Sequence, residues 1–205
     1  MILVIGLPAA VGLILLAGPM VTTLLARGRF SADDVRMTAY ALWAYGVGFL
    51  GFSLVKVLVP GFYARHEMKA PVRYAVTALI VGMTLSLALF AVNRVSPFQA
   101  PHVVLAASTS LTACLNALLL YRRLRRDKVF VPERGWGVFI FRVGTATVVM
   151  AALLALFSGP LTQWLELSEW HRIARLIVVI AGAIGAYFGV LFALGLRLGH
   201  LFDRP

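Results

Sequence analysis

Acidic residues are scarce in this chain, and cysteine is nearly absent. The 205 residues include 8 Asp and Glu and a single Cys, and only 13% are charged, whereas 61% are apolar. Ordinary soluble domains are about 45 to 50% apolar and about 25% charged. A water-soluble globule of this composition could not hide its apolar surface, so the composition argues against a soluble enzyme. The lone Cys114 excludes an intrachain disulfide and a cysteine-based metal cluster.

The few acids lie outside the long apolar runs of the sequence. They are Asp33, Asp34, Glu67, Asp127, Glu133, Glu166, Glu169 and Asp203. An intramembrane carboxylate is the usual proton carrier of a membrane relay, and this chain offers none. The histidines show neither an HExxH pattern nor metal-ligand spacing. Because no nucleophile, base and orienting group converge, we expect no enzymatic chemistry, no metal and no other cofactor.

Six charge-free runs, each at least 19 residues long, dominate what is present. They are Met1 to Ala26, Met37 to Val55, Tyr74 to Asn93, Val95 to Tyr121, Val143 to Leu165 and Leu176 to Leu196. A helix needs about 20 residues to cross a hydrocarbon core of about 30 Å. The sequence therefore predicts an all-α, polytopic membrane protein with six transmembrane helices. The second helix is expected to cover roughly residues 35 to 63.

The first run could be mistaken for a signal peptide. It has no basic n-region and no A-x-A-type cleavage site, it is long, and it contains Pro8 and Pro19. Proline is tolerated within transmembrane helices, where it bends them. We therefore expect a retained, kinked membrane helix.

Basic residues outnumber acids, 19 against 8, which gives a net charge of +11. In a soluble protein this excess would suggest nucleic-acid binding, but short cytoplasmic loops of membrane proteins are also enriched in Lys and Arg. Placing both termini in the cytoplasm puts 11 basic residues on that side and 6 outside. The basic run Arg122 to Lys128 then serves as a topology signal, in preference to a nucleic-acid or anionic-lipid patch. We expect no nucleic-acid partner.

Lys56 is the one cation well inside a predicted membrane helix, because the second apolar run continues beyond it to Ala64. It precedes Arg65 by nine positions, about 13 Å of helix, and a lysine stem can snorkel only part of that distance. A charge at membrane depth costs at least about 2.5 to 3.5 kcal/mol, so it normally faces a wet cavity or a partner. A snorkelling lysine on a tilted helix is the alternative interpretation. We favour the interpretation in which Lys56 faces a cavity or a partner.

Helical spacing places aromatic and mildly polar residues on the same face as Lys56. They are Tyr45, Phe49, Ser53, Pro60 and Tyr63. With no acid in any apolar run, Lys56 requires an anionic ligand or an acid from a region outside this chain. The candidate substrate-binding residues are therefore Lys56, Ser53 and Tyr63.

Two glycine patterns suggest close helix packing. Gly46, Gly48 and Gly51 spell GxGxxG, but no strand precedes them, so we interpret them as helix contacts and not as a dinucleotide fingerprint. Two pairs on the last predicted helix, Gly185 with Gly189 and Gly195 with Gly199, fit the small-xxx-small pattern. We expect these pairs to pack within the chain in preference to forming a dimer.

Several segments resemble the C-terminal part of the MurJ/MviN family of lipid II flippases, over nearly the whole chain. They are Leu7 to Leu13 with Pro19, Arg27 to Phe30 followed by Asp33, Val55 to Leu58, Pro60 to Arg65, Lys69 to Val72, and Leu115 to Tyr121. The stretch from Val55 to Val72 is the most specific, because its order of Lys, Phe-Tyr-Ala and Pro-Val matches a recurrent family segment.

The resemblance implies the last six of fourteen transmembrane helices. Residues 1 to 134 would supply four helices of the second lobe and residues 135 to 205 two additional C-terminal helices, which in the family shape a groove for a polyprenyl tail. Family members move lipid II from the cytoplasmic to the periplasmic leaflet of the bacterial inner membrane by alternating access. The implied partners are lipid II, membrane lipids and the missing N-terminal lobe. Lys56 matches a family lysine that faces the central cavity.

The sequence departs from the family at several positions. Glu67 stands where relatives often have Asp, and Ala70 where they often have Thr. Gly82 and Ser86 occupy positions where some relatives carry Asn or Asp that bind sodium. The resemblance therefore does not extend to a sodium site built from those side chains, and the missing acids argue against proton coupling within this segment.

Two other functions compete with the flippase interpretation. A non-transporting membrane interaction or scaffold module, or a half-protein that docks with another chain, would also fit the length of 205 residues. A transporter of another lipid-linked sugar is the third possibility, which the segment from Lys56 to Val72 favours less.

Overall fold

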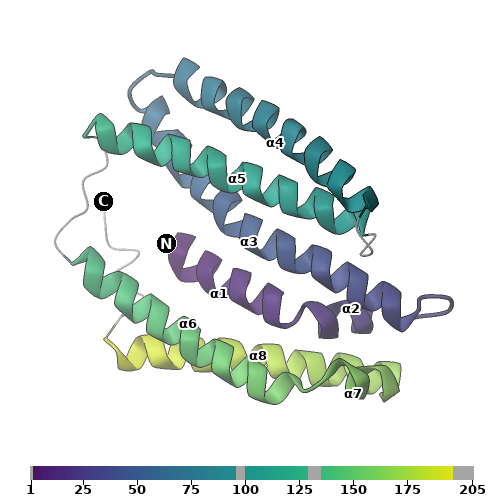
Figure 1. Cartoon of the computed structure of the whole chain (residues 1–205). Helices are drawn as coiled ribbons and strands as arrows, with labels where there is room; N and C mark the ends of the chain where they lie inside the picture. Colours follow the sequence, from purple (N-terminus) through teal and green to yellow (C-terminus); the bar gives the residue numbers. More distant parts are fainter. Residues whose placement is uncertain (1, 96–99, 129–134, 196–205) are drawn as a thin grey trace. The chain divides into compact units, whose positions relative to one another are not determined.

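Every regular element in the described part of the chain is a helix. A computed structural model describes residues 2–95, 100–128 and 135–195. The helices, labelled in Figure 1, are α1 (Ile2–Leu15), α2 (Ala17–Leu25), α3 (Ala32–Tyr63), α4 (Lys69–Val95), α5 (Pro101–Arg126), α6 (Trp136–Ser158), α7 (Leu161–Glu166) and α8 (Glu169–Ala193). The all-α prediction is confirmed for these residues. Five residues named above, Met1, Glu133, Leu196, Gly199 and Asp203, lie outside them.

Five helices, α3, α4, α5, α6 and α8, are long and apolar enough to cross a membrane. The pair α1 and α2 passes the same test as one span that bends by 67°. The structure therefore contains five to six candidate spans, as expected for a multi-pass membrane protein. The cytoplasmic placement of the two termini stays a prediction.

The bend between α1 and α2 confirms the predicted kink of the first helix. Pro19 has no backbone N–H, so the carbonyl of Leu15, four residues earlier, loses its helical donor. The chain turns at Leu16, whose N–H still donates to the Gly12 carbonyl at 2.9 Å. The Thr23 hydroxyl donates to the Pro19 carbonyl at 2.7 Å and reinforces the first turn beyond the break.

Local sequence sets the ends of α3. Ser31 and Asp34 form a reciprocal cap, because the Ser31 N–H donates to the Asp34 carboxylate at 2.9 Å and the Asp34 N–H donates to the Ser31 hydroxyl at 3.2 Å. Beyond Tyr63, His66 adopts a φ of 56° and the Glu67 N–H donates back to the Phe62 carbonyl at 3.1 Å. The helix thus covers Ala32–Tyr63, close to the predicted 35 to 63.

The run from Val143 to Leu165 does not form one helix. Helix α6 ends at Ser158 because Gly159 has a φ of 67° and Pro160 follows it. The short α7, which was not predicted, then buries Trp164 completely. The Trp164 indole N–H donates to the Ser158 carbonyl at 2.6 Å, and the Arg175 guanidinium lies 4.9 Å from its ring centroid.

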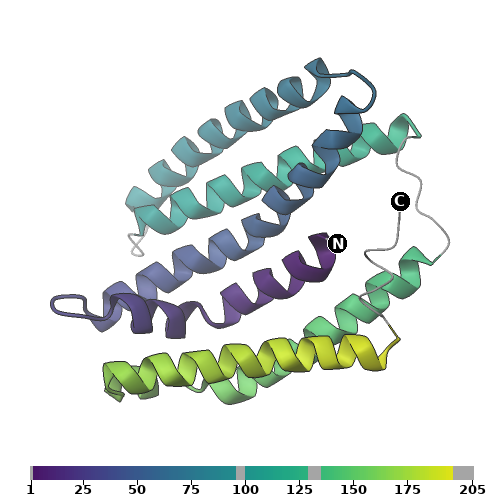
Figure 2. The ribbon, with the colours of Figure 1, turned by 180° about the vertical axis from the view of Figure 1, so that it is seen from behind.

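The chain divides into two compact units. Among the described residues, the first unit consists mainly of residues 3–39 and 135–195, and the second mainly of residues 40–95 and 100–128. In the first unit α6 packs along α8, and α2 contacts α7 and α8 (Figures 1 and 2). In the second unit α4 packs along α5. The predicted division at residue 134 stays a prediction.

Large apolar side chains fill the core of the first unit. Its buried residues are Val4, Leu16, Val143, Ala146, Met150, Leu154, Ala183, Tyr187 and Leu191. One polar contact crosses this core: the Tyr187 hydroxyl donates to the Val4 carbonyl at 2.6 Å. Pro8 lies four residues after Val4 and has no N–H to give it. Tyr187 therefore satisfies the carbonyl that Pro8 leaves without its helical donor.

The predicted packing role of the glycines in the last helix is wrong for Gly185 and Gly189. A Cβ atom added at Gly185 or Gly189 would meet no described atom within 4 Å, apart from neighbouring backbone. Both residues are exposed. Gly195 lies beyond the end of α8 and has a φ of 79°. Its predicted partner Gly199 lies outside the described residues, so that pair stays a prediction.

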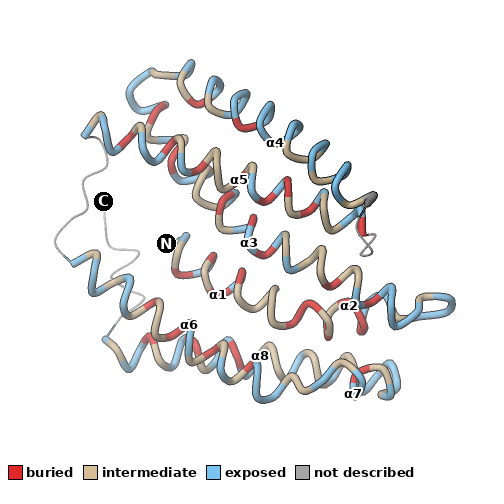
Figure 3. The backbone as a smooth tube through the Cα atoms, in the orientation of Figure 1, coloured by how far each residue is buried: buried red, intermediate tan, exposed pale blue. Residues whose placement is uncertain are grey.

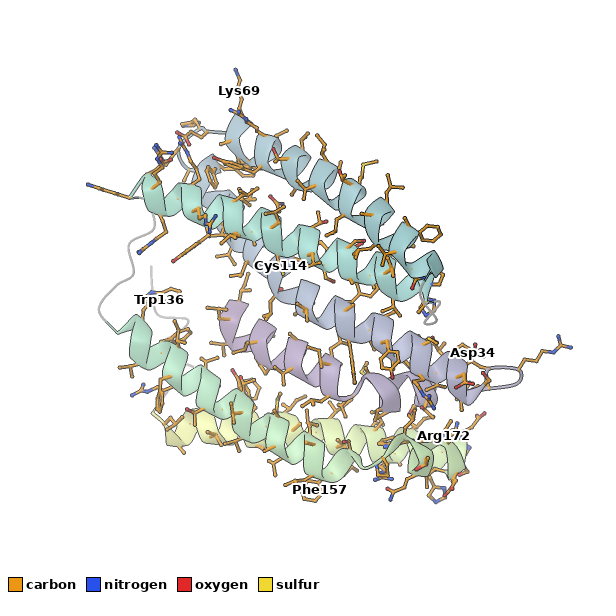
Figure 4. All side chains as sticks on the ribbon, in the orientation of Figure 1. Asp34, Lys69, Cys114, Trp136, Phe157 and Arg172 are labelled. Atoms are coloured by element: carbon orange, nitrogen blue, oxygen red, sulfur yellow. The ribbon has the colours of Figure 1, made fainter. Side chains whose placement is uncertain are left out.

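A single arginine ties the elements at one end of the first unit together. Arg172, labelled at the start of α8 in Figure 4, donates to the Leu165 carbonyl at 2.6 Å and to the Ala26 carbonyl at 3.3 Å. These carbonyls follow or end α2 and α7, where an arginine complements unpaired C-terminal carbonyls. Arg27 adds an ion pair with Glu169 at 3.4 Å.

Candidate functional site

Glycine brings α3 and α5 close together in the second unit. A Cβ atom at Gly51 would lie 2.7 Å from the backbone nitrogen of Cys114, and one at Gly48 would lie 2.8 Å from the Cα of Ser110. Gly61 lies against Leu124 further along. The two helices therefore run parallel, and the GxGxxG segment is confirmed as a helix contact.

A groove opens beside this contact, between α3, α4 and α5. Its volume is about 460 Å³. It is lined by Phe52, Val55, Lys56, Ala75, Ala78, Leu79, Gly82, Met83, Ser86, Leu105, Ser108, Thr109, Thr112, Ala113 and Asn116. Most residues of α4 are exposed, as the pale blue tube in Figure 3 shows. The lining residues make the groove mainly apolar, with one cation and a few hydroxyl and amide groups.

Lys56 lines this groove, and its role in substrate binding stays a prediction, as do the roles of Ser53 and Tyr63. Lys56 forms no hydrogen bond or ion pair with another described residue, and the groove lining contains no carboxylate. Ser53 and Tyr63 are not among the lining residues: Ser53 is half-buried, and Tyr63 is exposed at the last residue of α3. The structure therefore places Lys56 with Phe52 and Val55 of its own helix.

A row of hydroxyl groups on α5 forms one wall of the groove. The Ser108 and Thr109 hydroxyls both donate to the Leu105 carbonyl, at 2.9 and 2.8 Å, and the Thr112 hydroxyl donates to the Ser108 carbonyl at 2.7 Å. Their protons are committed to their own helix, but each oxygen keeps acceptor capacity. The α5 wall thus presents acceptors, whereas Lys56 presents donors.

Asn116 continues this row one turn further on and is incompletely paired. Its Oδ1 atom is buried and has no hydrogen-bond partner among the described residues. A buried acceptor without a donor costs about 1 to 3 kcal/mol. Asn116 lines the same groove as Lys56, but its unpaired Oδ1 atom is itself buried.

The groove does not fit a sodium site built from side chains at positions 82 and 86. A Cβ atom at Gly82 would collide with the Thr112 hydroxyl and would lie 2.9 Å from its methyl carbon. Gly82 has no side-chain ligand atom, and Ser86 could offer one hydroxyl. Lys56 in the same groove would also repel a cation.

An ion-pair network closes the end of the second unit where α3 and α5 terminate. Asp127 accepts from Arg65 at 3.3 Å and from Arg123 at 3.0 Å, and Arg65 also pairs with Glu67 at 3.6 Å. Beneath it, Leu58 and Phe62 of α3 pack on Leu120 and Leu124 of α5. This packing fixes the register of the two helices that present Lys56 and Asn116.

Comparison with known proteins decides the family. A model of the family described as "Lipid II flippase MurJ" matches residues 1–174. The chain belongs to the lipid II flippase MurJ family. It is 34% identical to the "Lipid II flippase MurJ" of Burkholderia cenocepacia, over 96% of this chain and 37% of that protein.

Two further members of the MurJ family show the same partial coverage. The "Probable lipid II flippase MurJ" of Vibrio cholerae is 37% identical over 98% of this chain and 37% of its own length. The protein of the same name from Haemophilus influenzae is 35% identical over 100% of this chain and 38% of its own length. The chain thus spans less than two fifths of these relatives. Their names do not favour the interaction-module alternative.

The sequence singles out Lys56 but none of the other residues that line the groove. The hydroxyl row could have been found, because Ser108 and Thr112 lie four residues apart on one helix face. The choice of Ser53 and Tyr63 relied on spacing within α3 alone. Which face of α3 meets α4 and α5 depends on contacts that spacing does not encode.

Proposed function

We propose that this chain is the C-terminal part of a lipid II flippase of the bacterial inner membrane and acts in transport, not catalysis. Residues 1–174 match the family, and the spans suit a membrane. The observation that carries the proposal for the site is Lys56, a cation in a mainly apolar groove that has no counter-ion among the described residues. Lipid II combines an apolar tail with an anionic diphosphate, which matches that combination.

Lys56 would act by electrostatic attraction. At an effective dielectric constant of about 20, two unit charges about 4 to 10 Å apart interact by roughly 2 to 4 kcal/mol. Such an attraction raises the concentration of an anionic head group at the groove without making a covalent bond. Translocation itself needs two lobes that rock about a central site, so the N-terminal lobe that the relatives possess is the required partner. Both termini of this chain would face the cytoplasm.

Binding of lipid II to the lobe-complete protein, meaning this chain assembled with that N-terminal lobe, tests the role of Lys56. We expect Lys56→Ala to weaken binding about tenfold, and Lys56→Glu to weaken it further by adding repulsion. Native mass spectrometry in detergent measures both. Lys69→Ala is the matched control, since it removes the same charge from the exposed first residue of α4. Unchanged affinity in both Lys56 variants would support the alternative interpretation, in which Lys56 snorkels to the membrane surface and binds no ligand.

Complementation tests the transport function itself. In cells depleted of their own flippase, we expect this chain co-expressed with the N-terminal lobe to restore growth. We expect this chain alone to fail, because it lacks one of the two lobes that alternating access requires. Growth with this chain alone would overturn the proposed dependence on the first lobe.

A further inference from the structure

We propose that Asn116 is an internal competitor for Lys56: rotation of the Asn116 amide lets the Lys56 ammonium donate to its Oδ1 atom, and an anionic head group draws the ammonium away. The structure describes both groups before they pair. This inference rests on the proposed function and concerns the regulation of the same groove. Both side chains line that groove, one from α3 and the other from α5.

Each group lacks what the other offers. The Asn116 Oδ1 atom is buried without a donor, and Lys56 has no acceptor among the described residues. An ammonium carries three donors and no acceptor, and an amide oxygen accepts up to two hydrogen bonds. The other acceptors on the α5 wall already share their oxygens with donation to their own helix. Asn116 is therefore the acceptor that gains most from the ammonium.

The register of α3 and α5 brings the two groups within reach. Gly51 lies against Ala113 and Cys114, and Gly61 lies against Leu124. Interpolation between these contacts puts Lys56 level with residues 118 and 119 of α5. Asn116 is then about 3 to 5 Å away along the helix axis, at about 1.5 Å per residue. The flexible four-carbon stem of lysine spans such offsets, and rotation of the amide turns its oxygen toward the groove.

The change in anion affinity on removal of the Asn116 oxygen distinguishes competition from direct ligand binding, because the two predict changes in opposite directions. A pairing that occupies Lys56 in the empty groove lowers the apparent affinity for an anion by the fraction of Lys56 left free. Removing the Asn116 oxygen should therefore strengthen anion binding. If Asn116 instead contacted the ligand, its removal would weaken binding. If it were only a packing residue, affinity would stay the same.

The experiment uses the lobe-complete protein in nanodiscs of zwitterionic phosphatidylcholine, with a short-chain prenyl diphosphate as the probe. Affinity is measured by calorimetry for Lys56→Ala, Asn116→Leu and the double variant. The uncharged prenyl alcohol is the comparator ligand. Thr77→Val is the control variant, because Thr77 is an exposed residue of α4 outside the groove whose hydroxyl donates to the Arg73 carbonyl.

We expect Asn116→Leu to bind the diphosphate about three- to tenfold more tightly and to bind the alcohol as the unmodified protein does. The double variant should match Lys56→Ala, because without the ammonium there is nothing to compete for. Unchanged or weaker diphosphate binding by Asn116→Leu would overturn the competition and leave the proposed role of Lys56 intact. Unchanged diphosphate affinity in the Lys56→Ala variant would overturn both the competition and the proposed role of Lys56.

Discussion

The two units hold their helices together by different means, although both contain glycine-rich helices. In the second unit, Gly48 and Gly51 of α3 let the backbone of α5 approach to distances that exclude a Cβ atom. In the first unit, large side chains and the Tyr187 hydrogen bond join α8 to its neighbours, and Gly185 and Gly189 of α8 meet no described atom within 4 Å of a Cβ position. One kind of sequence pattern thus has two structural meanings.

The difference follows from which face of each helix is occupied. Without a hydrophobic driving force in lipid, helices associate through close packing and hydrogen bonds, so small residues matter only where a neighbour uses them. In α8 the face that packs carries Ala183, Tyr187 and Leu191. The exposed glycines lie on other faces of the same helix, where they leave the surface hollow without joining anything described.

The strongest test of this comparison is Gly51→Ala. The new methyl group would lie 2.7 Å from the Cys114 nitrogen and 2.8 Å from the Ala113 carbonyl carbon. Backbone atoms cannot rotate away, so α3 and α5 must separate and the Lys56 groove must change shape. We expect destabilisation of about 1 to 3 kcal/mol, measured as reversible unfolding in mixed detergent micelles. A stability equal to that of the unmodified protein would show that the contact is looser than described.

The second test removes the polar contact of the first unit with Tyr187→Phe. The Val4 carbonyl then loses its donor, because Pro8 cannot supply one. We expect a loss of about 1 kcal/mol, since hydrogen bonds between membrane helices average about 0.6 kcal/mol and an orphaned buried carbonyl adds to that. The same unfolding measurement detects it.

Pro8→Ala supplies the control for this second test. It gives residue 8 an N–H that can donate to the Val4 carbonyl within α1. In that background Tyr187→Phe should cost much less, and the double-mutant cycle measures the difference. If Tyr187→Phe costs the same with and without Pro8, the hydroxyl does not act by replacing the proline's missing donor.

How far the sequence predicts this molecule can be judged at particular residues. The run lengths were sufficient for the long helices, because about 20 apolar residues have few alternatives to a span. Pro19 predicted a kink, but the bend lies at Leu16, since a proline frees the carbonyl of the preceding turn. The break after Ser158 was within reach too, from Gly159 and Pro160.

The candidate site was predictable only in part. Lys56 stands out from one helix alone, because a charge at membrane depth is costly wherever its helix points. Asn116 does not stand out, because an amide near the end of a transmembrane run costs little until a neighbouring helix buries it. The position of Asn116 relative to Lys56 depends on the Gly51 contact and on the packing of Leu58 with Leu124, which set the register of α3 against α5. Such long-range contacts have no signature in either helix considered separately.

The variant with the smallest expected effect, Gly185→Ala, is also the closest control for the comparison of the two units. Gly185→Ala is the same chemical change as Gly51→Ala, made where a Cβ atom meets no described atom within 4 Å. Because alanine loses less backbone entropy than glycine in a helix, we expect unchanged stability or a gain of up to about 1 kcal/mol, opposite in sign to Gly51→Ala. A clear loss in the lobe-complete protein would mean that a segment outside the described residues packs on α8. In that case the glycines of both units would form helix contacts. The units would then differ only in which segment packs against their glycines.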